Sequence, residues 1–229
     1  MQSLIDIDKS IFFFFNGMHN PFWDVVMALF TRTEYWILFY AILIFYIIKR
    51  YRLKAVLILV VIALTILVAD QFSGLIKDSV QRLRPTHDPS MQELVHNVLS
   101  RGGKYSYFSA HASNTFAVAT LLSLVFKNRN FNILIFCWAT VVSYTRLYLG
   151  VHFPFDIVTG IAFGLLLGWA MYKLILFSDK RLFMLGLPMV SDAKLRPKDL
   201  RFILIYFFVL LLSTFIVVNR LLHFNWIQL

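Results

Sequence analysis

The chain has 229 residues, of which 59% are hydrophobic and only 15% are charged, and 24 of them are Phe. This composition is too apolar for an ordinary soluble domain and indicates a membrane protein. The net charge of +10 comes from short Lys and Arg clusters between apolar runs, so anionic lipid head groups rather than nucleic acid are the expected partners. The single cysteine, Cys137, excludes both an intramolecular disulfide and a cysteine-based metal site.

Two short apolar runs, 10–15 and 22–30, open the chain and are separated by turn-forming residues at 16–20. Both runs are too short to cross a bilayer, which takes roughly 20 apolar residues. They predict two helices that lie at the membrane interface or cover the bundle.

Six longer apolar runs follow, and they predict an all-α, polytopic membrane protein with six transmembrane helices. The predicted spans are 35–48, 55–76, 111–126, 131–149, 155–177 and 202–218. The polar segment 77–107 is predicted to be a loop at the membrane surface. Because no repeat or linker divides the chain, residues 1–229 are expected to form a single membrane-embedded domain.

Basic residues predict the orientation of these spans. The connections 49–54, 127–129 and 173–201 hold more than half of all Lys and Arg residues. The positive-inside rule places these connections in the cytoplasm. The segment 77–107 and both chain termini are then expected on the outer or periplasmic face of a plasma or bacterial-type inner membrane.

Three polar segments on that outer side contain groups suited to phosphate chemistry. The first holds Lys77, Arg84 and Pro85, where a point charge and a planar guanidinium can both bind phosphate oxygens. Taken alone, this pair is also explained by basic side chains that reach lipid head groups from a helix end.

The second segment is Ser109, Ala110 and His111, at the start of the predicted span 111–126. Backbone N–H groups at a helix N-terminus bind anions, and Ser109 can cap that end or bond a phosphate oxygen. His111 can donate a proton to a leaving oxygen. The structural alternative is a plain cap and a hydrogen-bonded interfacial histidine.

The third segment holds Arg146, His152 and Asp156, where one predicted span ends and the next begins. Gly150 permits a tight turn, and the four-residue step from His152 to Asp156 can bring the carboxylate to the imidazole. An Asp on one ring nitrogen fixes the tautomer and frees the other nitrogen as a nucleophile. A buried ion pair between Asp156 and Arg146 is the structural alternative.

Taken together, these residues resemble the type 2 phosphatidic acid phosphatase superfamily. Its first motif, Lys separated by six residues from Arg-Pro, matches Lys77 with Arg84 and Pro85. Its third motif, Arg, His and Asp at spacings of five and three intervening residues, matches Arg146, His152 and Asp156. The second motif, Pro-Ser-Gly-His, departs here: the chain has Phe108-Ser109-Ala110-His111. The motifs run from residue 77 to 156, and the six-span layout extends the likeness to most of the chain.

The resemblance implies a lipid phosphatase that works through a phosphohistidine without a metal or other cofactor. His152 would be the nucleophile, Asp156 would orient it, and His111 would protonate the leaving oxygen and then activate water. The implied phosphate-binding residues are Lys77, Arg84, Ser109, Ala110 and Arg146. The vanadium-dependent haloperoxidases share this site but are soluble, so they fit the composition less well.

The substrate is expected to be a phosphorylated membrane lipid, with a lipid A-type glycolipid slightly preferred. Undecaprenyl diphosphate and phosphatidylglycerol phosphate are the alternatives, and the same residues also serve a lipid phosphotransferase. A hypothesis from another class of protein is a non-catalytic lipid-binding or transport protein that binds anionic lipid without turnover. The sequence does not indicate an oligomeric state.

Several other polar and aromatic residues are interpreted as structural. Asp70, seven residues before Lys77, is expected to pair with a basic residue. His87 and His96 are taken as ordinary loop histidines, and no cluster in the sequence indicates a separate metal site. Four tryptophans are interpreted as interfacial anchors: Trp23, Trp36, Trp138 and Trp226.

Overall fold

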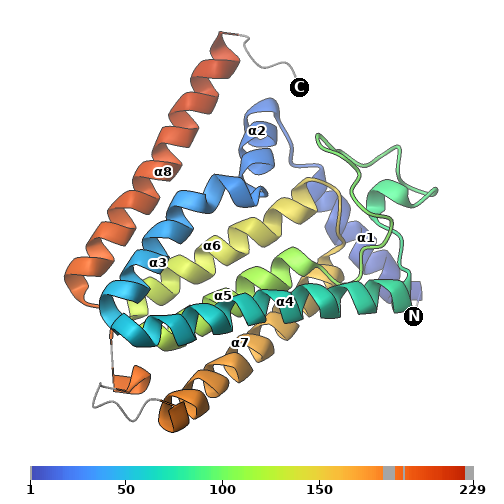
Figure 1. Cartoon of the computed structure of the whole chain (residues 1–229). Helices are drawn as coiled ribbons and strands as arrows, with labels where there is room; N and C mark the ends of the chain where they lie inside the picture. Colours follow the sequence, from blue (N-terminus) through green and yellow to red (C-terminus); the bar gives the residue numbers. More distant parts are fainter. Residues whose placement is uncertain (1, 183–188, 193, 225–229) are drawn as a thin grey trace.

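In a computed structural model the chain forms a bundle of helices (Figure 1). The structure describes residues 2–182, 189–192 and 194–224. Within these ranges the chain is all-α, as predicted, and its β structure is limited to one isolated bridge between Leu83 and Tyr105. The helices are α1 (Gln2–Asn16), α2 (Pro21–Phe30), α3 (Ile37–Tyr51), α4 (Ala55–Val80), α5 (Ala110–Phe126), α6 (Arg129–Tyr148), α7 (Pro154–Leu182) and α8 (Pro197–His223).

Each of the six predicted spans coincides with one helix from α3 to α8, and the two N-terminal runs coincide with α1 and α2. Several boundaries differ from the prediction: α7 runs to Leu182 rather than 177, and α8 covers Pro197–His223 rather than 202–218. Two other differences bear on the candidate site. Helix α1 begins at Gln2 rather than near residue 10, because its Asp8 is buried against a basic partner that a local pattern cannot reveal. Lys77 lies in the last turn of α4 rather than in a loop, because that helix continues to Val80 and stops where Gln81 adopts a left-handed conformation with φ of 52°.

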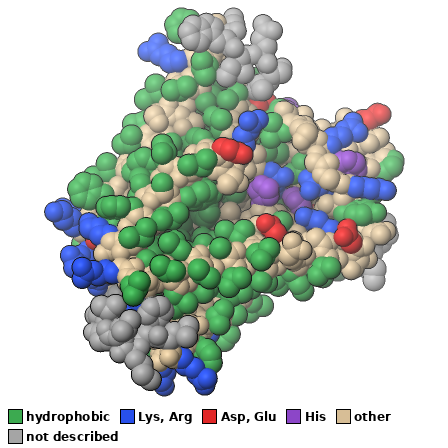
Figure 2. Space-filling view, in the orientation of Figure 1, with side chains coloured by type: hydrophobic (Ala, Val, Ile, Leu, Met, Phe, Trp, Pro, Cys, Tyr) green, Lys and Arg blue, Asp and Glu red, His purple; other side chains and the backbone are tan. Residues whose placement is uncertain are grey.

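Large apolar side chains cover the outside of the bundle (Figure 2). Among the described residues, three stretches are long and apolar enough to cross a membrane: Thr33–Val80, which contains α3 and α4, Pro154–Arg181 in α7, and Pro197–His223 in α8. The apolar helix α5 is shorter, at 17 residues. An exposed apolar surface of this extent is expected where helices contact lipid rather than water.

Helix α5 lies at the centre of the bundle and packs against α4, α6 and α7 (Figure 1). Its contact with α7 is close because α7 presents glycine at every fourth position. A methyl group at Gly160, Gly164 or Gly168 would lie 2.4–2.7 Å from a backbone oxygen of α5 or of its N-cap. This spacing lets two backbones touch, as small residues do between membrane helices. It fixes the start of α5 beside the start of α7.

The three basic connections meet at one end of the bundle. Tyr51 after α3 donates to the Val125 carbonyl at 2.6 Å, the Leu195 N–H donates to Phe126 O at 2.9 Å, and Lys54 pairs with Asp179 at 2.7 Å. The loop between α4 and α5, residues 81–109 and called the α4–α5 loop below, lies at the other end with α1 and the start of α7. The grouping of basic connections expected from the sequence is therefore present in the fold.

Two of the four tryptophans that were interpreted as interfacial anchors are buried instead. Trp36 and Trp138 are only 2% and 3% exposed, and their rings meet edge to face at 6.1 Å. They are core residues: Trp36, which directly precedes α3, and Trp138 on α6 pack ring against ring, and the Trp36 indole N–H donates to Phe30 O at 2.9 Å. Trp23 is partly exposed, and Trp226 lies outside the described residues.

Candidate active site

His152 and Asp156 meet at the turn between α6 and α7. Gly150 has φ of +70°, which reverses the chain after α6, and Pro154 begins α7 two residues after the histidine. The Nδ1 atom of His152 lies 3.5 Å from Oδ2 of Asp156, and both side chains are buried. This distance is long for a hydrogen bond, and Nδ1 has no other hydrogen-bond partner in the described part of the chain. Nδ1 therefore faces the carboxylate, with Nε2 on the other side of the ring.

The ion-pair partner of Asp156 is Arg82, not Arg146 as the structural alternative held. Arg82 Nη1 donates to Asp156 Oδ1 at 2.9 Å, and Nη2 donates to Asp8 Oδ2 at 2.6 Å. Its guanidinium also lies over the Phe153 ring, 3.9 Å from the centroid. Arg82 therefore bridges two carboxylates that are almost completely buried, and it stacks on Phe153, the residue that follows His152.

Asp156 and Asp8 also bind the backbone at the start of α7. Asp156 Oδ2 accepts the Phe153 N–H, and Asp8 Oδ1 accepts the Phe155 N–H, both at 2.9 Å. The first N–H groups of a helix have no partner inside the helix, so carboxylates are favourable there. Asp8 thus links α1 to the turn that holds the histidine. Sequence reasoning gave Arg82 and Asp8 no role, because the contacts join residues more than 70 positions apart.

Arg146 projects from the last turn of α6. Its Nη1 donates to the hydroxyl of Thr31, which ends α2, and its backbone carbonyl accepts the N–H groups of Val151 and His152 at 3.1 and 3.3 Å. Its Nε is buried and has no hydrogen-bond partner within the part of the chain described. A buried donor without a partner favours an anionic ligand beside it.

Helix α5 begins at the same point. Ser109 is its N-cap, as expected, and Ser109 Oγ accepts the Ala112 N–H at 3.4 Å. The Ser109 N–H donates to Asp156 O at 3.0 Å, which fastens the start of α5 to the start of α7. Ala110 and His111, the next two residues, both line a cavity described below.

Lys77 and Arg84 complete the site from the other side. Both side chains are half-buried, and Arg84 Nε donates to Tyr105 O at 3.2 Å. The charges of Lys77, Arg84 and Arg146 interact with one another and with His111. The structure therefore brings together the basic and histidine residues that the sequence predicted. Three positive charges at so short a range favour a polyanionic ligand such as a phosphate group.

The His152 ring is neutral at neutral pH. Burial lowers the pKa of His152 to about 4; the Asp156 contact opposes this shift, while Arg146 and Arg84 add to it. A neutral imidazole carries the lone pair that nucleophilic attack requires. The Asp156 carboxylate beside Nδ1 favours positive charge on the ring.

A cavity of about 530 Å³ runs from Ala110 and His111 into the bundle. Figure 2 shows a hollow with an apolar lining and with histidine and basic side chains gathered at one end. Among the apolar lining residues are Trp36, Tyr40, Leu43, Ile66, Leu122 and Trp138.

The end of the cavity beside His111 is polar. Thr31, Thr33, Asp70 and Asn114 line it, and Asn114 Nδ2 donates to Asp70 Oδ1 at 2.6 Å. Asp70 was expected to pair with a basic residue; its direct partner among the described residues is Asn114, and it interacts with the Lys77 charge only at longer range. The cavity combines an apolar body with a few hydrogen-bonding groups at one end, a composition typical of ligand-binding pockets.

Comparison with known proteins gives concordant matches. A curated lipid A 4'-phosphatase of Bacteroides thetaiotaomicron is 42% identical over 176 residues, which is 75% of this chain and 78% of that protein. A second lipid A 4'-phosphatase, from Porphyromonas gingivalis, is 33% identical over 184 residues, or 79% of this chain and 78% of that protein.

Two solved structures share the fold. The first is a PAP2-type phosphatidylglycerolphosphate phosphatase from Bacillus subtilis, with a TM-score of 0.59 and 21% identity over 81% of this chain and 90% of that one. The second is LpxE from Aquifex aeolicus, with a TM-score of 0.56 and 22% identity over 72% of this chain and 93% of that one. The family model of the PAP2 superfamily matches residues 54–180, which include every residue of the three motifs. The chain belongs to the PAP2 superfamily.

Proposed function

We propose that this protein is a metal-independent membrane phosphatase that removes a phosphate group from a lipid A-type glycolipid. The observation that carries the proposal is the cavity, which leads from an apolar interior through a polar end to His111. The charges of Lys77, Arg84 and Arg146 act on that histidine. A lipid whose phosphate is attached to a sugar matches that order of surfaces. The two lipid A 4'-phosphatases at 42% and 33% identity support the same substrate class.

The first chemical step is transfer of the phosphoryl group to His152. Its Nε2 attacks phosphorus and a P–N bond forms while the P–O bond to the lipid breaks. His111 protonates the departing lipid oxygen, so a neutral hydroxyl leaves. Asp156, at 3.5 Å from Nδ1, stabilises the imidazolium that forms on the ring.

The second step is hydrolysis of the phosphohistidine. His111 is now neutral and takes a proton from a water molecule that attacks the phosphorus. The P–N bond breaks, inorganic phosphate is released and His152 returns to its neutral form. A single residue can serve in both steps because the second transfer reverses the direction of the first.

The phosphate oxygens are bound by Lys77, Arg84 and Arg146, together with the start of α5 at Ser109 and Ala110. Arg146 contributes its unpartnered Nε. Since Ser109 Oγ already accepts the Ala112 N–H, its free hydroxyl proton remains available to donate to a phosphate oxygen. Fixed positive groups of this kind stabilise charge that develops in the transition state, and this is commonly the largest contribution to catalysis.

The protein is further proposed to be one domain with six membrane-crossing helices, α3 to α8, and with the active site on the periplasmic face. The clustering of the basic connections at the opposite end supports this orientation. Cys137 is replaced by Ser, and a new cysteine is introduced at Lys104 in the α4–α5 loop or at Arg129 at the start of α6. An impermeant maleimide added to spheroplasts is expected to label only the residue-104 variant. Labelling of the residue-129 variant instead would show the opposite orientation.

The decisive test of function is phosphate release by detergent-purified protein from four lipids, with EDTA present throughout. The panel holds lipid A, undecaprenyl diphosphate, phosphatidylglycerol phosphate and phosphatidic acid. We expect release from lipid A that is lost in His152→Ala. The matched control is His87→Ala, which removes a histidine from the α4–α5 loop outside the three motifs and retains activity.

Each other outcome has a definite meaning. Preference for one of the other three lipids keeps the chemistry but overturns the glycolipid assignment. Transfer of labelled phosphate to a second lipid without release identifies a phosphotransferase. No turnover of any lipid by folded protein leaves a non-catalytic lipid-binding or transport protein.

A further inference from the structure

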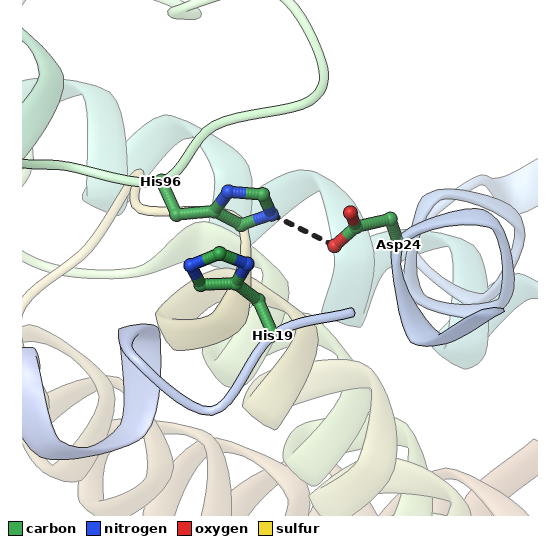
Figure 3. Close-up of side chains that lie close together, drawn as sticks. All are labelled: His19, Asp24 and His96. Carbon is green, nitrogen blue, oxygen red and sulfur yellow. Dashed lines mark hydrogen bonds and ion pairs between the residues drawn. The ribbon is translucent and has the colours of Figure 1, made fainter. Parts of the chain in front are cut away.

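A second cluster of chemically active side chains lies outside the residues assigned to catalysis. It consists of His19 in the α1–α2 connection, Asp24 in α2 and His96 in the α4–α5 loop (Figure 3). One ligand atom from each residue lies within 4.8 Å of the other two. The sequence alone does not reveal this cluster, because His96 is 72 residues from Asp24 and no short motif contains all three.

The three side chains already face one another. His96 Nε2 lies 2.7 Å from Asp24 Oδ1, and the His19 ring stacks on the His96 ring with centroids 3.7 Å apart and an angle of 5°. Figure 3 shows both imidazoles presenting a nitrogen on the side where Asp24 lies. Asp24 is buried while His19 is exposed, so the carboxylate is fixed and the outer imidazole is free to turn.

The surrounding residues hold this arrangement in place. The side chain of Asn16 makes two hydrogen bonds to the backbone of His96: its Oδ1 accepts the His96 N–H and its Nδ2 donates to the His96 carbonyl, each at 2.9 Å. Tyr148 donates its hydroxyl to Asp24 Oδ1 at 2.7 Å. Hydrogen bonds that orient ligating residues are typical of built metal sites.

We propose that His19, Asp24 and His96 bind a divalent transition metal, with Zn²⁺ the best match, at a structural site separate from the phosphate site. Two imidazole nitrogens and one carboxylate oxygen are common zinc ligands, at about 2.0–2.2 Å, and water completes the tetrahedron. Binding replaces the proton between His96 and Asp24 with the cation and widens that contact to roughly 3.3 Å, while His19 turns its exposed ring out of the stack.

The position of the cluster defines what the metal does. It ties the α1–α2 connection to the α4–α5 loop, which carries Arg84. Asp24 is also bonded to Tyr148, two residues after Arg146 on α6. A cation here stabilises the framework of the phosphate site but contacts none of its residues, so its removal lowers thermal stability and leaves the chemical step intact.

The test uses full-length protein purified through a tag that contains no histidine. The protein is stripped with EDTA, dialysed, and titrated with ZnCl₂. Bound zinc is measured by mass spectrometry, and Tm is measured by intrinsic fluorescence. We expect about one zinc per chain, and at free zinc near 100 times Kd we expect Tm to rise by a few degrees. His19→Ala and His96→Ala abolish both effects, and His19→Ala is the safer variant because its side chain is exposed.

Two controls separate this proposal from the proposed function. His87→Ala, another histidine of the α4–α5 loop, binds zinc as the wild type does. His152→Ala also keeps zinc binding and the Tm shift although it has no phosphatase activity. Zinc binding that is equal in wild type and His19→Ala, or no Tm shift in the wild type, overturns the metal site and reduces the cluster to a His–Asp hydrogen bond. Neither result bears on the phosphatase.

Discussion

Replacing Arg82 by Gln tests whether Asp156 is held in place by a partner outside the three motifs. The wild-type guanidinium bridges Asp156 at 2.9 Å and Asp8 at 2.6 Å, with both carboxylates almost fully buried. Glutamine keeps much of the side-chain length but removes the charge, and one amide cannot reproduce two ion pairs.

The expected loss of stability is large. Removing one partner of a buried ion pair typically costs about 3–5 kcal/mol, because the remaining charge is left without compensation. The Arg82 side chain is 25% exposed, so water replaces part of its effect and the lower end of that range is appropriate. In catalysis, loss of a group that orients a functional side chain commonly costs about 10- to 100-fold. Arg82→Gln is therefore expected to lose about that factor in kcat.

The assay must separate orientation from general destabilisation. We would measure kcat, KM and Tm of Arg82→Gln, and the pH dependence of kcat/KM. Without Arg82, the negative charge of Asp156 is balanced only by His152, so the pKa of His152 rises. The acid limb of the pH profile therefore moves to higher pH. Arg101→Gln, an exposed arginine of the same loop, is the matched control and leaves both profiles unchanged. The reasoning is refuted if Arg82→Gln retains wild-type kcat and an unshifted acid limb.

Three further outcomes are expected. Because burial lowers the pKa of His152 to about 4, kcat/KM should persist as the pH falls through 6.5 and should decline only near 4. A pH series in detergent checks this expectation, and a decline in kcat/KM near pH 6.5 contradicts it. Gly164→Leu should destabilise the bundle by about 1–3 kcal/mol, since even a methyl group there lies 2.5 Å from Ser113 O; a Tm unchanged from the wild type would show that α7 moves aside. Asn114→Ala should raise KM for lipid A but not for a small phosphate monoester, and equal changes for both would place Asn114 outside substrate recognition.

The helices and their order could be predicted because apolar runs are a local property. The predicted span 55–76 became α4, and Pro154 begins α7 as expected. The turn at Gly150 was also foreseen, since glycine favours the positive φ observed there. The boundaries that failed depend on contacts between distant segments: α1 extends over Asp8 because Arg82 neutralises that residue.

The same distinction holds for the candidate site. Spacing along the chain identified the His152 and Asp156 pair, because four residues across a turn bring the two side chains together. It could not identify Arg82 as the partner of Asp156, since Arg146 and Arg82 are equally basic and only the folded chain selects between them. The signal that was available, a third basic residue between Lys77 and Arg84, carries no direction by itself.

The arrangement of the cavity indicates how lipid binding can assist the chemistry at its end. Helix α4 carries both the cavity residue Asp70 and Lys77, which is proposed to bind phosphate. Thr31 both lines the cavity and accepts a hydrogen bond from Arg146. His111 belongs to the cavity wall as well as to the site. Under the proposed function, a lipid that fills the cavity contacts elements that hold the proposed phosphate-binding groups. Binding energy from parts of a substrate that do not react can be used to position the reacting groups, and this shared wall provides the physical route.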